Sequence, residues 1–165
     1  KDNDIFKGAK WKLRAIHTPG HTSNHICYEL IEEKTLFSGD HIMGWSTTVI
    51  SPPDGNMKDY LQSLEKLLNF SFDICWPTHG PSILNLKDFI RSIISHRIIR
   101  EKQILKSLES KNNIFDIVKD LYQDKDPSLY PAASQSVLAH LIHLVEKKIV
   151  TSEKNMNINS KFILR

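Results

Sequence analysis

Cysteine is scarce in this chain. The 165 residues contain two, Cys27 and Cys75, and both lie in apolar stretches. Their positions form neither a CxxC pair nor the dense spacing of a disulfide framework. Because structural disulfides belong mainly to oxidising compartments, this cysteine usage indicates a reducing, cytoplasmic location.

Long apolar runs are absent as well. No stretch approaches the roughly 18 consecutive apolar residues of a membrane-spanning helix. The first residues, KDNDIFKG, lack the apolar segment of a signal peptide. The sequence therefore predicts no membrane span, no export signal and no membrane partner. It begins with Lys and not with Met, which suggests a processed, split or truncated product.

Charge of one sign does not dominate the chain. The formal net charge is +3, and the surplus of Lys and Arg lies in residues 87–165. A basic surplus attracts polyanions such as RNA, but a surplus spread over several helices is also typical of a solvated surface. Charge alone leaves RNA binding open.

Residues 1–86 alternate between strand and helix patterns, which predicts an α/β layered arrangement. Turn residues separate the apolar runs, and residues 44–56 form a long predicted loop rich in Gly, Pro, Ser and Thr. The predicted strands cover residues 11–17, 25–31, 35–38 and 72–76. A predicted helix follows the loop, and its apolar face holds Tyr60, Leu61, Leu64, Leu67 and Leu68.

Residues 87–165 show a different pattern, with three predicted helices and no further turn that presents a His or Asp. The helices cover residues 88–109, 114–122 and 133–148, and residues 149–165 form a predicted hairpin. Three helices followed by a hairpin describe a winged-helix module. We therefore expect two domains, residues 1–86 and residues 87–165.

The first helix of this second part carries an apolar side and several cations. The predicted apolar side consists of Ile90, Ile93, Ile94, Ile98 and Leu105. The cations lie on a solvated face or contact RNA phosphates; they are Arg91, His96, Arg97, Arg100 and Lys102. His140 and His143 are expected at the edge of the core or on the surface, and not as ligands.

Three segments share the same local pattern. In each, a predicted strand ends in a turn bounded by Gly or Pro, and the turn carries a histidine or an aspartate. These segments present His21, Asp40 and His79. Each has a plainer interpretation alone, as a loop histidine or as an aspartate that bonds its own backbone. Together they suit a metal site, because divalent metals bind imidazole nitrogen and carboxylate oxygen from rigid positions.

The motifs TPGHT, FSGDHIMG and WPTHGP, in this order and spacing, resemble the third, fourth and fifth metal-binding motifs of the metallo-β-lactamase superfamily. The runs HTPGHT, GDHIMGWSTTVISPPDG and ISHRIIREKQIL resemble the β-lactamase-like endoribonucleases of mitochondria and their bacterial hydrolase relatives. The resemblance covers nearly the whole chain. It implies an α/β fold: the C-terminal half of an αββα metallo-β-lactamase sandwich, followed by a small winged-helix-like domain.

By motif, the resemblance implies that His21 binds a first zinc ion, that Asp40 bridges two zinc ions and that His79 binds the second. It also implies a hydrolase that acts on an ester, a thioester or a phosphodiester, with endoribonuclease activity among the options. The family takes its other ligands from an HxHxDH motif in the N-terminal half, and the sequence contains none.

Three ligands cannot hold two ions with a defined geometry and an open position. The 165 residues alone are therefore expected to bind zinc weakly and not to hydrolyse substrate. The expected partner is the missing N-terminal half or a second copy of the chain. Half a sandwich should also expose an apolar sheet face, so the lone chain is expected to associate or aggregate.

Three residues beside the predicted ligands need separate interpretation. Thr78 stands where the family's PGHGP motif has its first Gly. If that position requires a positive φ, Thr costs about 1–3 kcal/mol and disturbs His79. His25 and His41 are expected as ordinary hydrogen-bonding residues outside the metal set.

The function has two main alternatives at this stage. The chain is part of a zinc hydrolase that needs its other half, or it is a non-catalytic module that binds nucleic acid or protein through the winged-helix-like domain. A structural remnant of a split gene is a third option. The presence of all three ligand motifs that this half can supply favours the first.

Overall fold

A computed structural model describes all of residues 1–165. Five strands form one sheet, in which the order in space equals the order in the chain. They are β1 (Ile5–Lys7), β2 (Lys12–His17), β3 (Ile26–Leu30), β4 (Thr35–Gly39) and β5 (Ile74–Pro77). The strand β1, at the edge of the sheet, was not predicted from the sequence; it is short and exposed, so it carries no apolar alternation.

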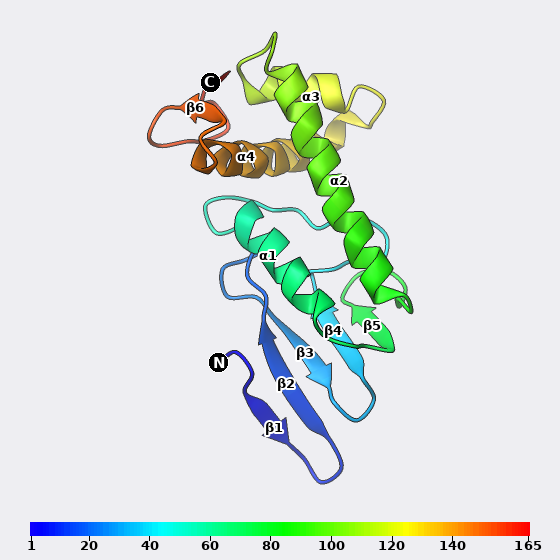
Figure 1. The fold of residues 1–165 in the computed structure, drawn as a ribbon. Helices are drawn as coiled ribbons and strands as arrows, with labels where there is room; N and C mark the ends of the chain where they lie inside the picture. The colour runs from blue at the N-terminus through cyan, green and yellow to red at the C-terminus, as the bar shows by residue number, and fades with distance from the viewer.

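The first four strands pair antiparallel, and β5 pairs parallel with β4. Since β2 and β4 both run antiparallel to β3, the strands β2, β4 and β5 point in the same direction (Figure 1). Their C-terminal ends therefore reach the same edge of the sheet. This topology determines where the residues that follow each strand can meet.

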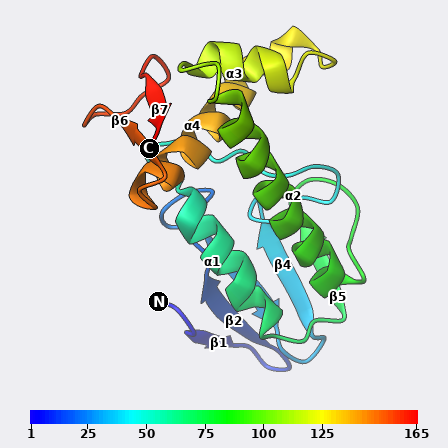
Figure 2. The ribbon, with the colours of Figure 1, turned by 45° about the horizontal axis from the view of Figure 1, so that its top comes forward.

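Two helices cover one face of the sheet (Figure 2). The helix α1 (Met57–Leu68) connects β4 to β5, and α2 (Leu86–Ser107) follows β5. The Asn56 side chain caps α1 by accepting a hydrogen bond from the backbone N–H of Asp59 at 3.1 Å. Buried residues recur in α1 at helical spacing and pack against the sheet; they are Met57, Tyr60, Leu64 and Leu67.

The opposite face of the sheet has no covering layer. Phe37 lies in register between Tyr28 and Trp76, so these three side chains share that face. Phe37 and Trp76 expose 42% and 50% of their surface, and Phe6 on β1 exposes 51%. The predicted exposed apolar sheet face is therefore present.

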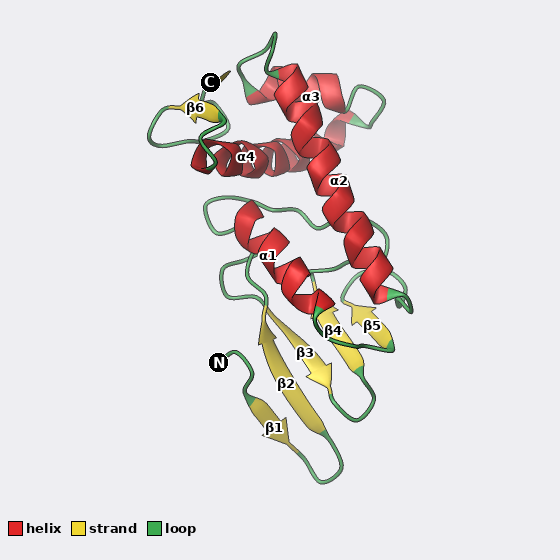
Figure 3. Cartoon of the chain, in the orientation of Figure 1, coloured by secondary structure: helices red, strands yellow, loops and turns green.

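The chain continues into a helical part (Figure 3). This part has its own apolar cluster, which contains residues from Ile104 to Phe162. Its elements are α3 (Ile114–Leu121), the short 3-10 helix η1 (Pro127–Leu129), α4 (Tyr130–Glu146), β6 (Val150–Ser152) and β7 (Phe162–Leu164). The end of α2, the helices α3 and α4 and the terminal hairpin reproduce the predicted three helices and hairpin.

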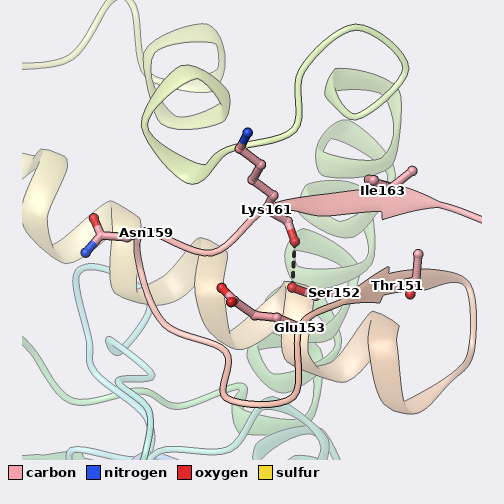
Figure 4. A pocket seen from close by; sticks show the side chains of 6 residues that line it. All are labelled: Thr151, Ser152, Glu153, Asn159, Lys161 and Ile163. Atoms are coloured by element: carbon pink, nitrogen blue, oxygen red, sulfur yellow. Dashed lines mark hydrogen bonds between the residues drawn. The ribbon is translucent and has the colours of Figure 1, made fainter.

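The hairpin β6–β7 is antiparallel and closes on a side-chain contact. The hydroxyl of Ser152 donates a hydrogen bond to the backbone carbonyl of Lys161 at 2.6 Å (Figure 4). Val150 of β6 and Phe162 of β7 are both fully buried in the helical cluster, so both strands hold the hairpin against the helical part.

The helix α2 contributes to both apolar clusters, through Ile90 and Ile93 at one end and Ile104 at the other. The predicted domain boundary at residues 86 and 87 stays a prediction, since this one helix joins both parts. The predicted apolar side was wrong at Ile98, which is 49% exposed. Arg97, predicted among the cations of the solvated or RNA-contacting face, is instead 4% exposed.

Arg97 is buried and Ile98 is exposed because other parts of the chain cover only one side of α2. Positions 90, 93, 97 and 104 follow one stripe along α2, and all four are buried. The stripe passes between the two apolar clusters at Arg97, where a loop and the ring of Tyr60 contact the guanidinium. Ile98 lies about 100° around the helix from this stripe and faces away.

None of the helices combines the length and the apolar character needed to cross a membrane.

Candidate metal centre

The three predicted ligands meet at the edge where β2, β4 and β5 end. Asp40 follows the last residue of β4 directly, and His79 lies two residues beyond β5. His21 follows β2 after the turn at Pro19 and Gly20. Parallel strand ends place these segments together, as their common design predicted.

Asp40 lies between the two histidines. Its Oδ2 is 4.0 Å from His21 Nε2, and its Oδ1 is 3.5 Å from His79 Nε2. Two donors that share one tetrahedral ion at ~2.0–2.2 Å stand roughly 3.3–3.6 Å apart, so the Asp40–His79 separation matches shared coordination. The Asp40–His21 separation is somewhat longer.

The Asp40 Oδ1 atom is buried and has no hydrogen-bond partner. A carboxylate oxygen without a partner is costly, because the group has lost water and gained nothing in return. A cation between Asp40 and the histidines would satisfy this oxygen, so the donor set fits a metal ion. The chain contains no group of three or more His, Cys, Asp or Glu side chains, however, that are already placed to hold a metal ion. The ligand roles of His21, Asp40 and His79 stay predictions.

The ring of His21 is oriented by the loop between β4 and α1. Its Nδ1 lies 2.8 Å from the Val49 carbonyl and 3.2 Å from the Thr48 hydroxyl. A protonated Nδ1 that donates to the carbonyl leaves Nε2 free to bind a metal, which is the usual arrangement for a metal-binding histidine. Periodicity and turn residues did not predict these contacts of Thr48 and Val49, because both lie in an irregular loop.

The segment around His79 is tied to the same loop. The Gly44 N–H donates a hydrogen bond to the His79 carbonyl at 2.8 Å, and the Trp45 ring stacks parallel to the His79 ring with centroids 6.3 Å apart. Gly80 has a positive φ of 95°, whereas Thr78 does not. The Thr78 N–H donates to the Gly39 carbonyl at 3.2 Å. Thr78 therefore lacks the positive φ that would have strained its backbone.

Two further histidines lie behind the predicted ligands. His25 Nδ1 makes a hydrogen bond with the Thr18 hydroxyl at 2.9 Å, as expected of an ordinary polar residue. His41 is fully buried against the Tyr60 ring, and neither of its ring nitrogens has a partner. The expectation that His41 forms hydrogen bonds was wrong for its ring. Burial lowers the pKa of His41 to about 3 and also lowers the pKa of His25.

Comparisons with known proteins agree with the fold. Residues 1–79 match the model of the metallo-beta-lactamase superfamily, and residues 114–157 match that of the beta-lactamase associated winged helix domain. The chain is 38% identical over 146 residues to the beta-lactamase-like protein 2 homolog of Drosophila melanogaster. That alignment covers 86% of this chain and 48% of the relative.

The chain belongs to the metallo-β-lactamase superfamily.

Two other proteins are also similar to this chain. An atrochrysone carboxyl ACP thioesterase of Aspergillus fumigatus is 33% identical over 109 residues, which are 66% of this chain and 33% of the relative. A metallo-beta-lactamase family protein from Thermus thermophilus superposes with a TM-score of 0.86 at 22% identity, over all of this chain and 53% of the other. The chain spans about half the length of the curated relatives from Drosophila melanogaster and Caenorhabditis elegans that it matches.

Proposed function

We propose that this metallo-β-lactamase chain forms part of a zinc-dependent hydrolase. The observation that carries the proposal is the position of Asp40, which turns one carboxylate oxygen to His21 and the other to His79. A carboxylate that bridges two ions must present its two oxygens to different ligand sets. This geometry supports the roles that the family motif implies.

In this proposal His21, Asp40 and His79 would hold the zinc ions. Zinc bound there would supply a hydroxide at neutral pH and would stabilise negative charge on the substrate oxygen. The loop at Thr48 and Val49 keeps His21 in the required orientation through Nδ1. Gly44 and Trp45 of the same loop position the His79 segment.

The site needs ligands that these 165 residues do not contain. No HxHxDH motif is present, and three ligands leave each of two ions short of a stable coordination shell. We propose that a polypeptide carrying this motif packs its own sheet onto the open face around Phe37 and Trp76. This partner completes both the sandwich and the metal centre. Without it the chain binds zinc weakly and turns over no substrate.

The substrate class is an ester, a thioester or a phosphodiester. The name of the Aspergillus fumigatus relative favours a thioester, whereas the resemblance to endoribonucleases favours a phosphodiester of RNA. Both reactions develop negative charge on an oxygen of the substrate, and bound zinc would stabilise that charge. The predicted metal centre suits both reactions, and the residues around it determine which substrate binds.

The test compares the pure chain with the chain co-expressed with a polypeptide that carries HxHxDH and the remaining sheet. Hydrolysis of an acyl thioester and of a short oligoribonucleotide is measured with and without chelator. We expect chelator-sensitive turnover of one substrate by the complex and none by the chain alone. Chelator-sensitive turnover by the chain alone would overturn the need for a partner. An inactive but zinc-loaded complex would overturn the hydrolase proposal.

A non-catalytic binding function is the second candidate. The observation that favours it is the beta-lactamase associated winged helix domain at residues 114–157, which is preceded by residues 87–113, where most of the basic surplus lies. Under this proposal the sheet acts as a scaffold and the helical part binds nucleic acid or protein. Salt-sensitive binding of an oligoribonucleotide by a chain that never shows turnover would support it over the first.

A further inference from the structure

A pocket of about 250 Å³ lies between the loop at residues 46–49, α2 and α4. It is separate from the predicted ligands His21, Asp40 and His79, none of which lines it. Its position, where the sheet-bearing part meets the helical part, is a common one for binding sites. Its volume is slightly below the ~300–1,000 Å³ of drug-sized ligand sites, so it suits a small group.

The lining of this pocket has an unusual charge balance. It contains two guanidinium groups and two imidazoles, from Arg97, Arg100, His96 and His140, and no carboxylate. Neither arginine has an acidic side chain within ion-pairing distance. Hydroxyl groups of Ser46, Thr47 and Ser136 add further donors.

Several of these groups are buried with unused hydrogen-bonding atoms. Arg97 is 4% exposed and His140 is 1% exposed. The Nε atoms of Arg97 and Arg100 and both ring nitrogens of His140 have no partner. A buried cation without a counter-charge or full hydrogen bonding is strongly unfavourable. An anion in the pocket removes that penalty, because it supplies both the charge and the acceptors.

The two arginines are held in fixed orientations. Arg97 donates from Nη2 to the Thr48 carbonyl at 2.6 Å, and its guanidinium lies 5.3 Å from the centre of the Tyr60 ring. Arg100 lies over the Tyr122 ring at 4.4 Å. Stacking on an aromatic face limits the freedom of a guanidinium and leaves its edge available for an oxyanion. The site is therefore organised before any ligand arrives.

We propose that this pocket binds a phosphate group. Phosphate offers several oxygens around one centre, which matches two guanidinium groups and nearby hydroxyls better than a planar carboxylate does. Burial lowers the pKa of His140 to about 3, so its neutral ring can donate one N–H to an oxygen. The phosphate is either free inorganic phosphate or a phosphate group of an RNA strand. Both present the same oxyanion chemistry to the pocket. This inference does not depend on zinc or on the proposed hydrolase activity.

The experiment measures binding by calorimetry to the full 165-residue chain in the presence of EDTA, with two probes: sodium phosphate and a short oligoribonucleotide. Chloride at equal ionic strength is the reference. We expect saturable binding of at least one probe that chloride does not reproduce. If only the oligoribonucleotide binds, the phosphate belongs to RNA; if phosphate alone suffices, the free anion is the ligand. No binding of either probe overturns the proposal.

Variants locate the binding. Arg100→Met removes one guanidinium and should weaken phosphate or oligoribonucleotide binding by about tenfold or more, the usual effect of losing a charged hydrogen bond. Lys87→Gln removes one positive charge from an exposed position of the same helix and should leave binding nearly unchanged. Equal losses in both variants would show diffuse electrostatic attraction and overturn the pocket.

A second variant covers the case in which Arg100→Met fails to fold. Ser136→Asp places a carboxylate in the lining, where it pairs with the arginines and occupies the anion position. This variant should fold at least as stably as the parent protein and lose binding of both probes. Retained binding in a folded Ser136→Asp protein would contradict the proposal.

Discussion

The guanidinium of Arg97 donates a hydrogen bond to the backbone carbonyl of Thr48 across 2.6 Å. The bond connects α2 to the loop whose next carbonyl, that of Val49, orients His21. One buried side chain thus joins the helical part to the loop that supports the predicted metal centre. Neither the burial of Arg97 nor its contact with Thr48 was predicted from the periodicity or the turn residues of the sequence.

Arg97→Ala should destabilise the protein by about 1–2 kcal/mol, because the cavity and the unpaired carbonyl that it leaves cost more than the removal of a buried, unpaired charge regains. Urea unfolding at neutral pH measures the free energy of unfolding. Arg91→Ala on the same helix is the control, since Arg91 is exposed and pairs only with Asp88. It should change stability by less than about 0.5 kcal/mol. Similar values for both variants would contradict a structural role for Arg97.

Gly20, immediately before His21, occupies a position that only glycine fits. Its φ is 137°, and a Cβ there would come within 2.3 Å of the Tyr60 Cα in α1. Gly20→Ala should therefore cost about 3 kcal/mol or more and move the turn that carries His21. Gly8→Ala is the comparison, because its Cβ meets only the movable side chain of Trp11. Thermal unfolding of both variants would test this, and equal midpoints would contradict it.

The predicted metal centre has a direct test in Asp40→Asn. An amide is a weaker zinc ligand than a carboxylate, and Asp40 is the residue that faces both histidines. In the chain completed by its proposed partner, zinc affinity should fall at least about tenfold, the usual scale for disturbing a metal site. Asp73→Asn, at an exposed position away from the centre, should leave affinity unchanged. Competition with a fluorescent chelator measures both, and unaltered affinity in Asp40→Asn would remove Asp40 from the ligand set.

Much of this arrangement follows from local sequence patterns. Alternation and turn residues predicted β2 to β5, and helical spacing at Tyr60, Leu64 and Leu67 predicted the buried face of α1. The turns after β2, β4 and β5 predicted that His21 and Asp40 would approach each other. Local patterns succeed here because each ligand directly follows a strand or turn with strong residue preferences.

The features that were not predicted depend on contacts between distant segments. Arginine is a residue type usually found at the surface. Arg97 is nevertheless buried, because the loop and α4 pack against α2. His140 is buried for the same reason. Thr48 lies in a stretch without periodicity, so its contact with His21 had no sequence signal. Tertiary packing, which no single segment encodes, determined these positions.

Stability should decrease as the solution becomes acidic, and His140 contributes to the loss. Burial, with Arg97 and His143 nearby, lowers the pKa of His140 from 6.5 to about 3. The unfolded chain therefore takes up a proton at His140 below pH 6.5 that the folded chain refuses. The contribution of His140 to the free energy of unfolding is therefore fully present above pH 6.5. It is lost as the pH falls toward 3, by up to about 1.4 kcal/mol per pH unit.

His140→Leu should make this dependence shallower between pH 6.5 and 4, while the buried His41 keeps part of it. Denaturant unfolding at a series of pH values gives the slope for both proteins. Above pH 7 the two curves should run parallel, which serves as an internal control. An unchanged slope in the variant would mean that His140 is accessible to protons in the folded state.

The open sheet face should make the chain alone self-associate. Phe6, Phe37 and Trp76 each expose between 42% and 51% of their surface on or beside one apolar surface. Large aromatic side chains contribute strongly to interfaces, because each removes roughly 150–250 Å² from water. The double variant Phe37→Lys and Trp76→Lys places two charges in this surface and should shift the chain toward monomer in sedimentation experiments.

Phe115→Lys is the matched control for that shift. Phe115 is 59% exposed on α3, outside the sheet, so its replacement should leave association unchanged. Addition of the proposed sheet-bearing partner should also suppress self-association, because it covers the same face. A parent chain that remains monomeric at tens of micromolar, or a control variant as effective as the double variant, would exclude the face around Phe37 as the binding surface.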